Sequence, residues 1–234
     1  MPDDFKTTRW SVVLAAAGRE SDRGDALGWL CEAYWYPLYA FVRRRGHDPE
    51  SARDVVQSYF LRVMEKDVFQ GVDPGAGKFR AFLLASMKNF LSNEREREQA
   101  QKRRAENPAF TVSLDGADEL YRREASQELN AEELFEKRWA LTVLARAVDR
   151  LGQEYDQLGR GDLFERLRGL LTGDAEDSYA EIAAALDMKQ GAVKTAIHRM
   201  RNRLGRVLRE EVAQTVSDPD QLDDEIRHLL HVVG

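Results

Sequence analysis

Cysteine pairs and long apolar runs are missing from this sequence. The single cysteine, Cys31, excludes an internal disulfide, and its place within LCEAYWY predicts a small buried core residue in a reducing compartment rather than a catalytic thiol. No apolar run approaches the length that spans a bilayer, and the charged segment MPDDFKTTRW lacks the layout of a signal peptide. We therefore expect a cytoplasmic protein without a membrane partner.

Signatures of catalysis and of cofactor binding are also scarce. The sequence has no glycine-rich phosphate loop and no cysteine and histidine spacing of a metal site. Its four histidines are scattered, and although His228 and His231 stand at helical spacing, a surface position on a short tail helix is the more ordinary interpretation. We therefore expect no enzyme, no catalytic residue, no metal and no cofactor.

Period-two alternation, the mark of strands, is rare. Apolar residues recur instead at helical spacing almost throughout, which predicts an all-α fold. Pro37 lies inside one expected helix and should kink it or split it in two. Asp48 followed by Pro49 predicts the start of the next helix, an N-cap acceptor before a preorganised first residue.

The chain is expected to form two small helical domains joined by a charged linker, the second ending in a helix-turn-helix, plus a short C-terminal helix. The expected boundaries are 1–98 for the first domain, 99–137 for the linker, 138–212 for the second domain and 213–234 for the C-terminal extension. The linker is predicted because the apolar period fades after Glu98 into charged residues. Asp218 and Pro219 predict the start of the last helix, which is acidic on its polar face.

The net charge of −6 looks unsuited to nucleic-acid binding only when it is averaged over the chain. Acids collect in 115–136 and 218–225, whereas bases collect in 80–104 and 189–209. Charge is therefore regional, and a DNA-binding segment is compatible with an acidic chain.

The segment from Tyr179 to Arg209 carries the strongest functional signal. Two apolar helical faces flank a turn of about three residues around Met188, the connection typical of a helix-turn-helix. Beyond this turn the chain is rich in bases and has no acid as far as Arg209, as expected for a helix lying against phosphates. The residues expected to contact DNA are Lys189, Gln190, Lys194, Thr195, His198, Arg199, Arg201 and Arg203. The alternative is a solvated basic face on a core helix.

Five segments together resemble one known family. Three of them resemble its polymerase-binding and minus-ten segments: ALGWLCEAYWYPLYAFVRRRG, DPESARDVVQSYF and FRAFLLASMKNFLSNERER. Two more, DSYAEIAAAL and GAVKTAIHRMRNRL, resemble its minus-thirty-five helix-turn-helix. The chain thus resembles a bacterial RNA polymerase sigma factor of the extracytoplasmic-function type, within the sigma-70 family, with sigma domains 2 and 4 only. The segment FKTTRWSVV, the linker and the tail resemble a subgroup with extensions.

The resemblance implies a transcription initiation factor that binds core RNA polymerase and directs promoter recognition on promoter DNA. It implies core-polymerase binding by Asp54, Gln57 and Phe60, although Phe60 also fits a core position. Further acids usual in the family are replaced here by Arg53 and Ser58, so a phosphate on Ser58 would restore negative charge. An anti-sigma factor and a regulatory kinase are further candidate partners.

The resemblance also assigns a minus-ten surface. The loop 71–78 is the expected wall of a pocket for a flipped base. Acids at 94, 96 and 98 interleave with the bases there, unlike the more purely basic family pattern. The residues suited to phosphate and base-edge contacts are Arg80, Lys88, Asn89, Asn93, Arg95 and Arg97.

Two alternatives remain open. One is a stand-alone helix-turn-helix regulator that binds duplex DNA without polymerase, and it would not need the aromatic and basic helix of the first domain. The other is an interaction protein whose acidic C-terminal helix docks on a partner. Because an acidic amphipathic helix follows a basic one, we also expect the tail to pack on the second domain and block its DNA surface.

Overall fold

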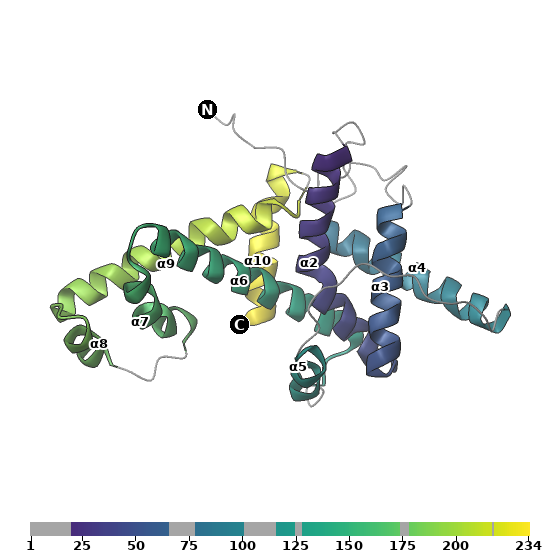
Figure 1. Ribbon diagram of the computed structural model, residues 1–234, viewed down its shortest axis with the longest axis horizontal. Coiled ribbons are helices and arrows are strands. Elements are labelled where there is room, and N and C mark those ends of the chain that lie inside the picture. Colours follow the sequence, from purple (N-terminus) through teal and green to yellow (C-terminus); the bar gives the residue numbers. More distant parts are fainter. Residues whose placement is uncertain (1–19, 66–77, 101–115, 125–127, 174–177, 217) are drawn as a thin grey trace. The chain divides into compact units, whose positions relative to one another are not determined.

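The computed structural model describes residues 20–65, 78–100, 116–124, 128–173, 178–216 and 218–234, and most of these are helical (Figure 1). Within these ranges no β-strand forms, so the all-α prediction is confirmed. The predictions for FKTTRWSVV, for most of the loop 71–78 and for linker residues up to Asp115 lie outside the described residues. The helices are α2 (Glu20–Arg44), α3 (Pro49–Glu65), α4 (Phe79–Ala100), α5 (Ala117–Glu124), α6 (Ala131–Gln157), α7 (Gly161–Thr172), α8 (Tyr179–Ala185), α9 (Gln190–Ala213), η1 (Pro219–Gln221) and α10 (Leu222–Val233).

The chain divides into two compact units. Unit 1 comprises residues 1–142 together with 212–234, and unit 2 comprises residues 143–211. Helix α5 and the first turns of α6 lie within the stretch 99–137 that the sequence indicated as a linker. The C-terminal segment groups with unit 1. The domain boundaries drawn from the sequence stay a prediction about how the chain divides in function.

Unit 1 is built on α2, α3 and α4, which pack on one another. Tyr34 of α2 meets Phe79 of α4 edge to face, with ring centroids 5.0 Å apart, and Tyr59 of α3 meets Phe90 of α4 at 5.6 Å. These aromatic pairs bury large apolar areas and add geometric preference of about 1 kcal/mol each. Large aromatic side chains therefore fix how the three helices cross.

Pro37 does not divide α2, which is one helix from Glu20 to Arg44. Of the two expected outcomes, a kink or a split, the split is therefore excluded. Proline removes one backbone hydrogen bond, but the residues that follow it, from Leu38 to Val42, are completely buried. Packing of this stretch in the core outweighs the local cost.

The start of α3 follows the prediction from Asp48 and Pro49. The Asp48 carboxylate accepts hydrogen bonds from the backbone N–H groups of Glu50 and Ser51, both at 3.0 Å. A bond from the Ser51 hydroxyl at 2.5 Å, together with these backbone bonds, lowers the pKa of Asp48. The side chain thus satisfies donors that a helix N-terminus otherwise leaves unpaired.

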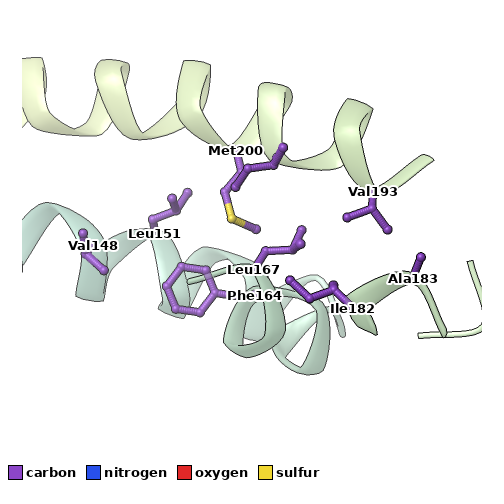
Figure 2. Close-up of a cluster of buried hydrophobic side chains, with 9 residues drawn as sticks. Val148, Leu151, Phe164, Leu167, Ile182, Ala183, Val193 and Met200 are labelled. Carbon is purple, nitrogen blue, oxygen red and sulfur yellow. The ribbon is translucent and has the colours of Figure 1, made fainter. Parts of the chain in front are cut away.

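Unit 2 has its own apolar core, drawn from four helices (Figure 2). The side chains of Leu151, Phe164, Leu167 and Met200 converge in Figure 2 between α9 and the helices beneath it. Gly152 permits a close approach, because a Cβ at this position would lie 2.9 Å from the Phe164 ring. The buried residues are Val148 and Leu151 of α6, Phe164 and Leu167 of α7, Ile182 and Ala183 of α8, and Val193, Ile197 and Met200 of α9.

Candidate nucleic-acid and polymerase interface

Helix α3 presents a polar surface next to the core of unit 1. Asp54 and Ser58 are exposed and Gln57 is half-buried, so all three are accessible to a partner. Phe60, which the resemblance assigns to polymerase binding, is completely buried. Its ring lies 5.5 Å from that of Tyr59. Phe60 therefore holds α3 in place and does not form part of the surface in this structure.

The middle of α4 forms a second polar surface. Asn89 and Asn93 are exposed and four residues apart, so they lie on one face of the helix. Lys88 is half-buried, and its Nζ lies 2.8 Å from Oε1 of Glu132, which lowers the pKa of that carboxyl group. Arg95 and Arg97 belong to the last turns of α4, and their side chains lie outside the described part of the chain.

Arg80 differs from the expectation, because it is only 8% exposed and its guanidinium is surrounded by carboxylates. Nε and Nη2 donate to the two carboxylate oxygens of Glu225 at 2.5 and 3.2 Å, and Nη1 donates to Glu136. Burial lowers the pKa of Arg80, but the bonds and charges of Glu225 and Glu136 outweigh it and raise that pKa. In this state Arg80 does not offer the surface contact that a minus-ten role requires. The pairing spans 145 residues, and nothing in local spacing reveals it.

The α8 N-terminus is a reciprocal cap. The Ser178 hydroxyl accepts from the backbone N–H of Glu181 at 3.3 Å, and the Glu181 carboxylate accepts from the backbone N–H of Ser178 at 2.7 Å. This capping box satisfies two donors at once, and the bonds from Ser178 lower the pKa of Glu181.

We expect Ser178→Ala to lower the free energy of unfolding by about 1 kcal/mol, because the helix loses its N-cap acceptor. Urea denaturation followed by circular dichroism measures this change. Ser58→Ala, at an exposed position within α3, is the control and should leave the free energy within about 0.5 kcal/mol. An equal effect of both substitutions would contradict the capping role.

A tight turn joins α8 to α9. The connection runs from Leu186 to Lys189, and Asp187 adopts a φ of 49°, the left-handed conformation that Asp tolerates better than most residues. The turn is closed by the backbone N–H of Met188, which donates to the carbonyl of Ala183 at 2.9 Å. Asp187 therefore takes the backbone conformation that closes the turn between α8 and α9.

Most residues expected to contact DNA are exposed on α9 or at its start. Arg201 is steadied by a bond from Nη2 to the Leu170 carbonyl at 2.8 Å, and Thr195 donates to the Gly191 carbonyl at 2.9 Å. The His198 ring lies 3.2 Å from the Asn202 side-chain amide. The exposed residues are Lys189, Gln190, Lys194, Thr195, His198, Arg199 and Arg201.

Arg203 of α9 is the one residue of the predicted DNA-contact set that is not exposed. It is half-buried and forms a bidentate ion pair with Glu154 of α6. Nε and Nη2 donate to the Glu154 carboxylate at 2.7 and 2.5 Å. This pair lowers the pKa of Glu154, chiefly through the Arg203 hydrogen bonds. Arg203 therefore positions α9 against α6.

An open hollow of about 430 Å³ lies beside this pair. Its arginines include Arg160 in the turn before α7, a position that no motif in the sequence marks. By helical spacing, Arg199 and Arg206 lie on a different flank of α9 from Lys194 and Arg201. The lining residues are Glu154, Tyr155, Leu158, Arg160, Arg199, Asn202, Arg203 and Arg206.

Three further observations concern the cysteine, metal ligands and membrane-spanning helices. Cys31 is completely buried, and burial followed by the charge of Glu32 raises the pKa of its thiol to about 12. Among the residues with described positions, no group of three or more His, Cys, Asp or Glu is placed to hold a metal ion. In that same part of the chain, no helix combines the length and apolar character needed to cross a membrane.

A comparison with models of known protein families finds a match. Residues 30–101 match the family model described as Sigma-70 region 2. The matched segment covers most of α2 and all of α3 and α4, the helices that carry Asp54 and Asn89. Comparison with curated proteins and with solved structures yields no match. Residues 30–101 are therefore similar to region 2 of the sigma-70 family.

Proposed function

We propose that this protein is a sigma factor of the extracytoplasmic-function type, which binds core RNA polymerase and directs it to promoters from the cytoplasm. The single observation that carries the proposal is the match of residues 30–101 to sigma-70 region 2. Helix α9 of the same chain adds a flank on which Lys194 and Arg201 are exposed. Region 2 would bind polymerase and the minus-ten element, and unit 2 would read the minus-thirty-five element. The account requires no catalytic residue and no cofactor.

The geometry of α8 and α9 supports a helix-turn-helix role for unit 2. In such motifs the first turns of the second helix meet base edges, and later bases contact phosphates. Gln190 and Lys194 occupy these first turns and are exposed, whereas Val193 and Ile197 fix the helix on the core. Polar and apolar residues are thus separated around the helix as DNA docking requires.

The α3 surface supports polymerase binding in region 2. Asp54 is exposed on a helix whose opposite face is anchored by buried Val56 and Tyr59. An exposed acid on a rigid helix suits a basic partner surface, where charge complementarity sets register. Ser58, one turn later, is also exposed and accessible to a kinase, and comparison of Ser58→Ala with Ser58→Glu in core binding would test that control.

Asp54→Lys is expected to weaken binding to purified core polymerase by about tenfold or more, because it places like charges together. Fluorescence anisotropy of the labelled full chain, titrated with core polymerase, measures the affinity. Asp149→Lys, an exposed acid of α6 in unit 2, makes the same charge change and should bind as the wild type does. If the two variants bind equally well, the α3 surface does not contact polymerase.

The same titration separates this proposal from the stand-alone regulator. A regulator would bind duplex DNA without associating with core polymerase. The exposed bases Lys194 and Arg201 of α9 are compatible with that alternative, but the region 2 match favours the sigma factor.

A further inference from the structure

The C-terminal segment is built into unit 1 at the start of α4. The backbone N–H of Phe79 donates to the carbonyl of Thr215 at 3.1 Å, and an isolated β-bridge joins Lys78 to Val216. Phe79 is the first residue of α4, whose N–H groups have no partner within the helix. The C-terminal segment therefore supplies one of the hydrogen-bond acceptors that cap α4.

A buried carboxylate secures this arrangement. Glu225 of α10 is completely buried, and its carboxylate pairs both with Arg80 and with Lys78, whose Nζ lies 2.6 Å away. Burial of Tyr34 and, next, the negative charge of Glu225 raise the pKa of the Tyr34 hydroxyl, in keeping with a carboxylate inside the core of region 2. Glu225 therefore pairs with both cations at the start of α4, and Glu136, which also pairs with Arg80, supplies the second negative charge.

A second set of contacts holds the rest of α10. Nε2 of His228 lies 2.9 Å from the Glu136 carboxylate, which also binds Arg80. The Trp139 ring is near both side chains, with its centroid 6.1 Å from that of the His228 ring and 5.0 Å from the Arg80 guanidinium. Leu222 and Leu229 are buried on the same helix. The described contacts of α10 thus lie in unit 1, and they differ from the expectation that the tail packs on the second domain.

We infer that the segment 212–234 is an internal cover of region 2, which occupies Lys78 and Arg80 and competes with single-stranded promoter DNA for them. Both cations lie within the segment matched as region 2, and phosphates and the Glu225 carboxylate are alternative anionic partners for them. Removing one partner of a buried ion pair leaves an uncompensated charge, which is costly. The segment 212–234 therefore stays in place until another anion binds Lys78 and Arg80. This inference rests on the proposed function, and it names the regulation of that site.

The test compares Glu225→Gln with wild type in binding a fluorescein-labelled random 20-nucleotide single-stranded DNA. Glutamine keeps the size and hydrogen-bonding oxygen but removes the charge, which favours the open state, and we expect about tenfold tighter binding. Asp224→Asn is the matched control, because Asp224 is exposed and paired with Arg227, and it should bind as wild type does. Arg80→Gln added to Glu225→Gln should remove the gain.

Hydrogen exchange of the α10 amides in the wild-type chain provides a second measurement. It needs no substitution, so a variant that folds differently cannot explain its result. Adding the DNA to the wild-type chain is expected to speed exchange in 222–233 while exchange in α3 stays unchanged. If exchange in α10 does not respond and Glu225→Gln binds no more tightly, the cover is overturned, and α10 is a fixed part of unit 1. Core-polymerase binding and transcription by the wild type would still support the proposed function in that case, so the two failures are distinguishable.

Discussion

Leu167→Ala is expected to lower the free energy of unfolding by about 2–5 kcal/mol, one of the largest effects of any single change in this chain. Leu167 of α7 is completely buried in the apolar cluster of unit 2, where it lies below Met200 of α9 (Figure 2). Its truncation removes apolar contacts and leaves a cavity that neighbours such as Met200 fill only in part. Because the same cluster holds α9 in position, DNA binding should fail at a lower temperature than in the wild type.

Leu158→Ala provides the matched comparison. It removes the same atoms from a side chain that is 69% exposed, so we expect a change within about 0.5 kcal/mol. Urea denaturation followed by far-ultraviolet circular dichroism reports both, because the described part of unit 2 is mostly helical and contains no tryptophan. Equal losses for the two variants would mean that the cluster does not stabilise unit 2.

The double substitution Lys194→Glu and Arg201→Glu is expected to reduce affinity for a minus-thirty-five duplex by about a hundredfold or more. Each reversal removes a charge-assisted contact worth about 1.5–3 kcal/mol and adds repulsion from phosphates. Both side chains are exposed on one flank of α9, and neither belongs to the buried core, so the fold should persist. Gel-shift titrations at several salt concentrations measure the affinity and the salt slope.

Arg166→Glu serves as the control for this pair, because Arg166 is an exposed base of α7 in the same unit. It should change the affinity by no more than about threefold through long-range charge, which added salt screens. The double variant should lose about two phosphate contacts. The slope of log affinity against log salt concentration should therefore become smaller in magnitude by about two. A double variant that binds like Arg166→Glu would exclude the assigned flank of α9.

Sequence patterns anticipated those features that depend on neighbours along the chain. The helical spacing of Ile182, Val193 and Ile197 predicted the buried faces of α8 and α9, and Asp48 with Pro49 predicted the start of α3. Such features follow from periodicity and capping, which act over a few residues. Exposure of Lys194 followed for the same reason, since a helix with one face in the core presents the other to solvent.

Pairings between residues far apart in the chain do not follow from local sequence patterns. Arg80 looked like a surface base at a helix start, and Glu225 like a solvated acid, yet the fold buries them together. Arg203 was predicted on the DNA surface, but Glu154 of another helix takes its guanidinium. The sequence does not indicate whether the partner of a basic side chain is a phosphate or a distant carboxylate. The split that was expected at Pro37 does not occur for a related reason, because tertiary packing overrides the local preference.

The most direct test of the central claim is in-vitro transcription with purified core RNA polymerase and a library of upstream promoter fragments. The account predicts start sites that depend on the added protein, and their loss when Lys194→Glu and Arg201→Glu are combined. It also predicts that the upstream elements shared by those fragments include one that binds unit 2. Duplex binding without core association and without any new start site would contradict the account and leave the stand-alone regulator in its place.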